Sequence, residues 1–224
     1  MNNSKKEGLH VGGWRRAGIA FVASFLFFLT YAYVRYIVIK GESAANLPLY
    51  LSNKAIALAS VVLIGLSFLL GSLAKFWPKK FEKTLYLRKY FGVSGFAAAS
   101  FHAISSLILF TPSYYPKLFS AEGKLTLSGE LSMVSGILAL FIFSAAAVTS
   151  LPSVEESMSK RQWFLIQRTG YLAFFLVMLH VFFMGIQGWL TPAKWPGGLL
   201  PLSLIAFVLI AIVLIMKFVT VWKD

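Results

Sequence analysis

The sequence predicts an all-α membrane protein, a bundle of six transmembrane helices with the N and C termini in the cytoplasm. Hydrophobic residues make up 58% of the 224 positions and charged residues only 13%, whereas soluble domains carry about 25% charged residues. The mean hydropathy is +0.75. The apolar residues also gather in six blocks, and the basic residues fall mostly on one side of them. Together these observations exclude a soluble domain.

The six blocks each have the length of a membrane-spanning helix, which needs about 20 apolar residues. None alternates as a membrane β-barrel strand would, so helices are the remaining solution. The first block ends in Tyr33 and Tyr36 without a small-residue cleavage site, and we interpret it as a retained helix. We expect a cytoplasmic tail over residues 1–16 and a six-helix domain over residues 17–222. The blocks are residues 17–39, 55–76, 91–110, 131–150, 169–189 and 199–221.

The basic residues between the blocks orient the bundle by the positive-inside rule. Fifteen lie on the predicted inner side and six on the outer side. The formal charge of +13 is then explained by topology and by anionic lipid headgroups, so no nucleic-acid partner is expected. The prediction is an integral, multi-pass protein of the plasma or inner membrane. The fifteen are Lys5, Lys6, Arg15, Arg16, Lys75, Lys79, Lys80, Lys83, Arg88, Lys89, Lys160, Arg161, Arg168, Lys217 and Lys223; the six are Arg35, Lys40, Lys54, Lys117, Lys124 and Lys194.

Two histidines lie inside predicted membrane helices, where an ionisable residue indicates function. His102 and His180 each stand eleven residues after the start of an odd-numbered block, roughly 16 Å into the membrane. Gly92 and Phe96 before His102 recur as Gly170 and Phe174 before His180. The chain has no cysteine, which excludes thiolate metal sites and covalent haem attachment. Two level, neutral imidazoles fit the axial ligation of one b-type haem.

Other roles for these histidines stay open at this point. Membrane histidines also form interhelical hydrogen bonds, as in a non-redox transporter or a structural bundle. A proton relay lacks carboxylates, because the blocks contain none besides Glu130, and zinc requires a third or fourth ligand. A second haem is excluded because Arg88 and Lys194 stand where further histidines would be needed.

The residues around the two histidines resemble the STEAP metalloreductases, members of the ferric-reductase-like transmembrane superfamily. The run from Arg88 through Phe96 to His102 is similar to that family's third helix, and residues 147–154 and 164–171 are similar to its inner loop and fifth helix. The resemblance extends from Trp14 to Lys217. It implies one b-type haem near the outer leaflet, FAD in the inner half, and reduction of extracytoplasmic ferric or cupric ions. It also implies a homotrimer.

Carried over by position, the resemblance assigns six residues. His102 and His180 are the axial haem ligands, and Phe143 lies between flavin and haem on the catalytic path. Arg88 and Gln167 contact the flavin, with Ser150 beside it. For Arg88 this agrees with the bidentate pairing of guanidinium and phosphate.

The sequence departs from the family in two respects. No G-x-G-x-x-G fingerprint is present, so the family's cytoplasmic dinucleotide-binding domain is expected to be absent and electrons to come from a separate cytoplasmic reductase or reduced flavin. Gln167 precedes His180 by 13 residues, one fewer than in the family, which loosens its correspondence.

The sequence also leaves open which molecule accepts the electrons on the outer side of the membrane. The outer lysines Lys54, Lys117, Lys124 and Lys194 could steer an anionic metal chelate, although solvated loop lysines explain them equally. An alternative is a haem subunit that serves a periplasmic oxidoreductase.

Overall fold

The structure is a computed structural model that describes residues 3–222, except for the side chains of residues 3–10, 46 and 47. Residues 1 and 2 of the predicted tail and Lys223 lie outside the described residues. Over the described residues the chain forms helices and no β-strand. Six of these helices are long and apolar enough to cross a membrane. The predicted all-α, six-span fold class is therefore confirmed.

The six long helices are joined by short helices and loops. The long ones are α1 (Asn3–Ala32), α2 (Ser52–Phe76), α4 (Leu87–Ile108), α5 (Leu127–Val148), α7 (Lys160–Trp189) and α8 (Leu202–Trp222). Helix α1 continues as a π-helical segment (Tyr33–Ile39), a second such segment (Leu47–Leu51) precedes α2, and α3 (Pro78–Phe81) and α6 (Pro152–Ser157) lie in two connections.

Several helices begin before their apolar blocks, and α7 begins nine residues before the predicted residue 169. Its start is fixed by a capping box. Ser159 Oγ accepts a hydrogen bond from the backbone N–H of Gln162 at 3.3 Å, and Gln162 Oε1 accepts one from the backbone N–H of Ser159 at 3.1 Å. Such caps satisfy free N–H groups with polar residues, so a helix can start well outside the hydrocarbon core. The chain is also helical through most of the predicted tail, as part of α1.

Helix α2 is the centre of the bundle. Over its most apolar window 56% of the residues are buried, compared with 17–28% for the other five spans. It packs against α1, α4 and α8, while α5 packs against α7. Close approach of α2 and α4 depends on Gly95, because a Cβ atom there would stand 2.7 Å from Ile64 Cγ1. Small residues at such crossings allow close helix packing in membranes.

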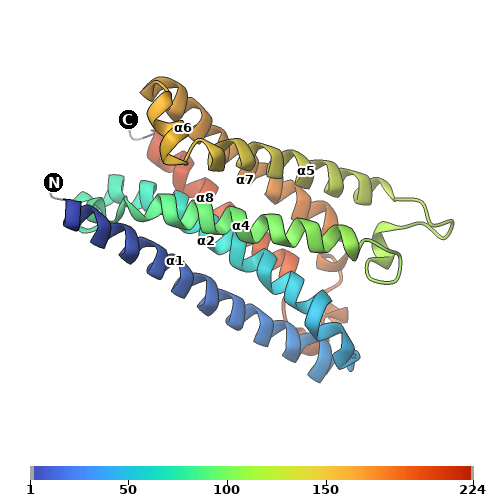
Figure 1. Cartoon of the computed structure of the whole chain (residues 1–224). Helices are drawn as coiled ribbons and strands as arrows, with labels where there is room; N and C mark the ends of the chain where they lie inside the picture. Colours follow the sequence, from blue (N-terminus) through green and yellow to red (C-terminus); the bar gives the residue numbers. More distant parts are fainter. Residues whose placement is uncertain (1–2, 223–224) are drawn as a thin grey trace.

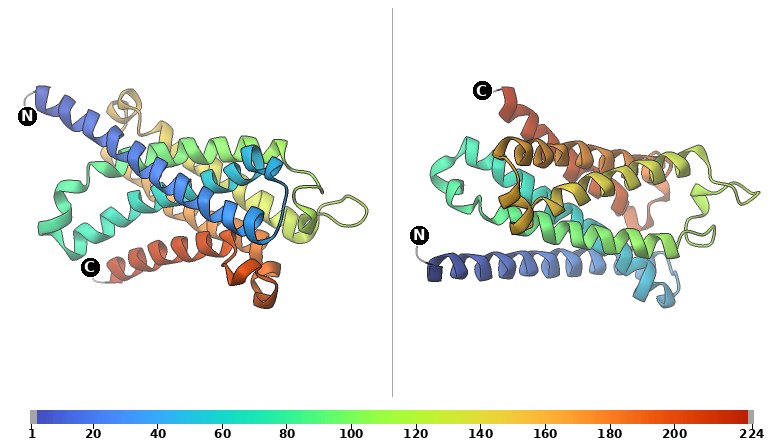
Figure 2. Two further views of the ribbon diagram at one scale, coloured as in Figure 1. Left: turned by 90° about the horizontal axis from the view of Figure 1, so that it is seen from below. Right: turned by 45° about the horizontal axis from the view of Figure 1, so that its top comes forward.

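The start of α1 and the end of α8 lie at the same end of the bundle (Figures 1 and 2). The loop between α4 and α5 extends from the opposite end and holds an isolated bridge between Phe119 and Leu125. The first residues of α4 therefore lie toward the end where the chain begins and finishes. In the text below this is the terminal end, and the other is the loop end.

Candidate functional site

The two membrane histidines come from helices that pack on different partners. His102 lies on α4, which packs mainly on α2, and His180 lies on α7, which packs on α5 and α8. The two imidazoles are close enough to interact electrostatically. Both side chains are half-buried. The structure therefore brings together the pair that the sequence predicted.

The imidazole of His102 is held by an amide from α2. His102 Nδ1 lies 2.9 Å from Asn53 Oδ1. Asn53 Nδ2 donates to Ser106 Oγ at 2.9 Å, which turns the amide oxygen toward the ring. Since an amide oxygen only accepts hydrogen bonds, Nδ1 carries the proton and Nε2 of His102 keeps its lone pair.

The imidazole of His180 is held by the backbone of α5. His180 Nδ1 lies 2.8 Å from the carbonyl oxygen of Ser132, and Ser132 Oγ lies 3.1 Å from the same nitrogen. The ring lies against Gly136, where a Cβ atom would be only 2.9 Å from Nδ1. A carbonyl accepts a hydrogen bond from Nδ1 and leaves Nε2 unprotonated, as for His102.

The donor set at this level is two neutral imidazoles with unprotonated Nε2 atoms. Within residues 3–222 no group of three or more His, Cys, Asp or Glu side chains could hold a metal ion. Such a pair suits a haem iron, whose other four ligands belong to the porphyrin, and is too small a set for a structural zinc ion. His102 and His180 are thus the residues that could hold a haem.

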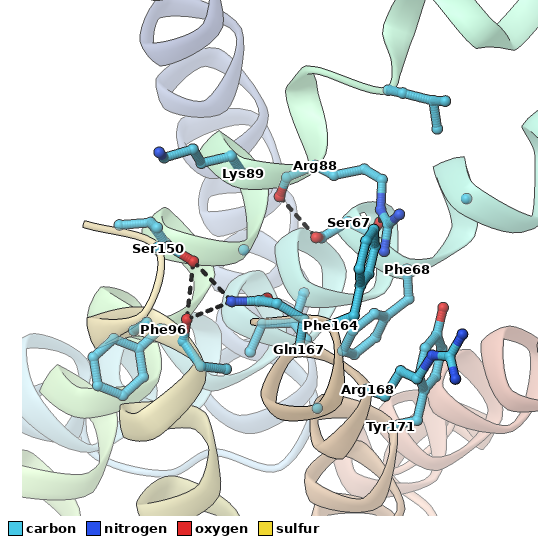
Figure 3. Close-up of a pocket in the computed structure, with 18 of the residues that line it drawn as sticks. Ser67, Phe68, Arg88, Lys89, Phe96, Ser150, Phe164, Gln167, Arg168 and Tyr171 are labelled. Atoms are coloured by element: carbon cyan, nitrogen blue, oxygen red, sulfur yellow. Dashed lines mark hydrogen bonds between the residues drawn. The ribbon is translucent and has the colours of Figure 1, made fainter. Parts of the chain in front are cut away.

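A cavity of about 870 Å³ lies toward the terminal end of the bundle (Figure 3). Its volume falls within the range of about 300–1,000 Å³ that is usual for ligand pockets. Residues of α2, α4, α5, α7 and α8 line it. Its lining includes all four of the remaining sequence-predicted site residues, Arg88, Phe143, Ser150 and Gln167.

Arg88 is anchored at the start of α4 against α2. Its Nε donates to the carbonyl oxygen of Ser67 at 3.0 Å, while Ser67 Oγ donates to the carbonyl oxygen of Arg88 at 2.7 Å. The guanidinium lies over Gly71, where a Cβ atom would be 3.3 Å from Arg88 Cζ. Because this anchor uses Nε, the terminal nitrogens are the donors that remain for an anionic ligand.

Gln167 is tied to the end of α5. Its Nε2 lies 2.9 Å from the carbonyl oxygen of Ala146 and 3.2 Å from Ser150 Oγ (Figure 3). The same nitrogen lies 3.1 Å from Thr149 Oγ1. Trp163 Nε1 strengthens the same junction by donating to the carbonyl oxygen of Thr149 at 3.0 Å. The amide nitrogen of Gln167 is therefore engaged by the protein, and Oε1 is the atom left for a ligand.

Aromatic side chains form part of the cavity wall. Phe143 is buried in a core cluster with Phe68 and Phe174, and it lines the cavity. The rings of Phe68 and Tyr171 stack at 4.4 Å between centroids. Along α5, Phe143 is two turns from Gly136, or about 10 Å, so it lies between the cavity and the residue that contacts His180.

The cavity is strongly basic. Its only acidic lining residue among those described, Glu155, forms an ion pair with Lys89 at 3.1 Å. The ammonium of Lys217 lies 5.2 Å from the centroid of the Tyr171 ring. An excess of cations around a confined space attracts anionic ligands. The basic lining residues are Lys75, Arg88, Lys89, Arg168 and Lys217.

Comparison with known proteins agrees with this geometry. The family of ferric reductase like transmembrane components matches residues 56–178, more than half of the chain. The chain belongs to this family. With six apolar spans, it is an integral, multi-pass membrane protein.

The similar proteins are metalloreductases. Metalloreductase STEAP2 of Homo sapiens is 27% identical over 207 residues, covering 79% of this chain and 42% of that protein. STEAP2 of Mus musculus is 26% identical with the same coverage, and STEAP3 of Rattus norvegicus is 26% identical over 203 residues, with 77% and 42% covered. The chain spans less than half the length of these relatives. They confirm the STEAP-like transmembrane domain and support the prediction of an oxidoreductase.

The family match covers His102 and most of the cavity residues, but it ends before Lys217 of the cavity lining and two residues before His180. It also starts after Asn53, a partner of His102 that the sequence analysis missed. The apolar block was predicted to begin at residue 55, whereas α2 begins at Ser52. A polar amide beside an apolar helix was the signal that could have identified Asn53.

The four lysines predicted to lie on the outer side differ in their surroundings. Lys54 lies inside the second span, and its ammonium is 4.5 Å from the Tyr36 ring centroid and 3.9 Å from that of Tyr50. Lys117, Lys124 and Lys194 are exposed in the connections between the long helices, and Lys124 lies 3.7 Å from a carboxylate oxygen of Glu122.

Proposed function

We propose that the protein is a STEAP-like transmembrane reductase that passes electrons through FAD and one bis-histidine haem b to ferric or cupric ions outside the cell. The observation that carries this proposal is the state of the two histidines. Both Nδ1 atoms donate to protein oxygens, so both Nε2 atoms keep the lone pair that a metal ion would need. A non-redox bundle would not require this shared orientation.

A haem would be held by His102 on α4 and His180 on α7. A haem iron ligated in this way accepts and releases one electron at a time. The hydrogen bonds from Nδ1 to Asn53 and to the Ser132 carbonyl orient the two rings and raise their strength as ligands. Gly136 leaves the space into which the His180 ring fits.

The flavin would occupy the basic cavity. A flavin takes up two electrons and releases them singly, which links a two-electron donor to a one-electron wire. Arg88 supplies guanidinium donors for the diphosphate, and Lys75, Lys89 and Lys217 line the same space. Phe143 closes the cavity toward the histidines and excludes water from that boundary. Gln167 and Ser150 hold the wall between α5 and α7.

The direction of electron flow follows from the charge distribution. Basic residues are enriched in the segments at the terminal end, which we assign to the cytoplasm by the positive-inside rule. The cavity then opens toward a cytoplasmic electron donor, a separate reductase or reduced flavin, and the loop end faces the metal acceptor. The membrane is the plasma or inner membrane, and the acceptor is a ferric or cupric chelate.

Spectra of the purified protein test this proposal. We expect a b-type Soret band that shifts on reduction, and FAD among the cofactors released on denaturation. His102→Ala and His180→Ala are each expected to abolish the band, because one imidazole cannot hold the iron in a bis-histidine site. His10→Ala is the control at the third histidine and should leave the spectrum unchanged. A colourless wild-type protein would contradict the proposal.

A further inference from the structure

Asn53 is a buried amide beside His102. It lies near the start of α2 with only 2% of its surface exposed. A buried amide without hydrogen-bond partners is destabilising, so its contacts account for its place in an apolar span. Its Oδ1 accepts from His102 Nδ1 at 2.9 Å, and its Nδ2 donates to Ser106 Oγ at 2.9 Å.

The neighbours of Asn53 fix which way its amide faces. Ser106 Oγ lies 3.3 Å from His102 Nδ1 as well, so the amide, the hydroxyl and the imidazole form a closed triangle. The phenol of Tyr115 lies close to Ser106 and Asn53. Burial raises the pKa of Tyr115, and these two polar neighbours oppose the rise. The phenol is therefore neutral at physiological pH, and no charge competes for the amide.

The two histidines differ in what accepts their Nδ1 proton. For His180 the acceptor is the backbone carbonyl of Ser132 at 2.8 Å, which is present whatever the side chain at that position. For His102 it is the side chain of Asn53, which comes from a different helix. The orientation and electronic character of His102 thus depend on one replaceable side chain.

We propose that Asn53 is a positioning residue that fixes the Nδ1-protonated tautomer of His102 and sets its strength as a ligand to the haem iron. This inference rests on the proposed function. A hydrogen bond accepted from Nδ1–H gives the ring more electron density, which favours the oxidised iron. Loss of the acceptor favours the reduced iron and raises the midpoint potential.

The first test is redox titration of haem-loaded variants. For Asn53→Leu we expect the oxidised-to-reduced equilibrium to shift about threefold to tenfold toward the reduced form, as for the loss of one hydrogen bond; tenfold equals about 59 mV for a one-electron couple. Asn53→Asp keeps an acceptor oxygen and should hold the potential at or below the wild-type value.

Two controls separate this role from general packing. Ser60→Ala changes another buried polar residue of α2, whose hydroxyl donates only to the Ala57 carbonyl, and should leave the potential unchanged. Ser132→Ala keeps the carbonyl that accepts from His180 Nδ1 and should shift the potential less than Asn53→Leu does.

The second test does not require haem. In haem-free protein with ¹⁵N-labelled histidine, the nitrogen chemical shifts report which ring nitrogen carries the proton. We expect the Nδ1–H tautomer for His102 in the wild type and a mixture of tautomers in Asn53→Leu, even if that variant loses haem. His102→Ala and His10→Ala assign the signals.

The outcomes distinguish the two proposals. A wild-type protein without haem contradicts the proposed function. A haem-loaded wild type with an Asn53→Leu variant of unchanged potential contradicts the role of Asn53 alone, as does an unchanged tautomer of His102 in the haem-free variant.

Discussion

Two regions of the bundle differ in their polar groups. One is the region around His102 and His180, here called the histidine level, and the other is the basic cavity. At the histidine level the polar groups are small, neutral and hydrogen-bonded to one another, as with Asn53 and Ser106. The cavity is a space of about 870 Å³ with long basic side chains around it. A closed neutral site holds a permanently bound group in fixed geometry, whereas an open charged site suits an anionic ligand that enters from water.

The difference follows from membrane depth. Charged side chains are costly in hydrocarbon, so the imidazoles at mid-bundle are positioned by an amide and a carbonyl. Near the terminal end, side chains such as Arg88 and Lys217 reach water and can remain charged. The first site therefore depends on packing and hydrogen-bond geometry, and the second on electrostatics. Substitutions should separate them.

The largest effect is expected at the boundary between the two sites. Phe143 is 7% exposed, and Phe143→Ala removes a buried ring at a cost of about 3–5 kcal/mol, which should lower the thermal unfolding midpoint in detergent. Phe141, two residues away on α5, is 76% exposed and gives the control Phe141→Ala, for which we expect little change. Equal loss in both variants would show that Phe143 is not a structural boundary.

The next largest effect is expected on FAD binding in the cavity, without a change at the histidines. Arg88→Ala removes a cationic donor worth about 1.5–3 kcal/mol in a charge-assisted hydrogen bond. We expect FAD affinity, measured by fluorescence titration, to fall roughly tenfold to a hundredfold, with the Soret band unchanged. Lys79→Ala is the matched control, because Lys79 is exposed at the same end and does not line the cavity. Unchanged FAD affinity in Arg88→Ala would remove Arg88 from the flavin site.

Haem content should be sensitive to side-chain volume added next to His180. In Gly136→Val the new side chain meets the His180 ring, since even a Cβ atom would be 2.9 Å from Nδ1. Overpacking of this kind costs about 1–3 kcal/mol, and we expect reduced haem content with FAD binding preserved. Gly18→Val adds the same side chain to a helix at a point with no heavy atom within 4 Å of the new Cβ. Haem content that is equal in the two variants would contradict the proposed packing of His180.

The smallest effect is expected at the mouth of the cavity. Glu155→Gln removes the acidic partner of Lys89, and partly exposed ion pairs of this kind are worth about 0–1 kcal/mol. We expect anionic ligands to bind at most about fivefold more tightly, with the difference vanishing in high salt as charges are screened. Glu156→Gln is the neighbouring exposed control. A weaker affinity in Glu155→Gln would show that the carboxylate itself binds the ligand.

The sequence predicted the spans because the hydrocarbon core imposes a length and a composition that can be read without knowing the fold. The helix ends were less accurate. Helix α7 starts at Lys160 because its capping box, Ser159 with Gln162, lies among polar residues that carry no membrane signal. Resemblance to a family assigned Arg88, Gln167 and Ser150 to the flavin and Phe143 to the path between flavin and haem, and all four line one cavity.

By itself the sequence determined six apolar spans, an excess of basic residues on one side, and two histidines at one depth. The tertiary structure decided what holds those histidines. His102 depends on Asn53 of another helix, and His180 on a carbonyl of α5 and on the space beside Gly136. These contacts join residues about 50 positions apart. Sequence periodicity indicates which face of a helix is apolar, but the meeting of two particular side chains depends on how the helices cross.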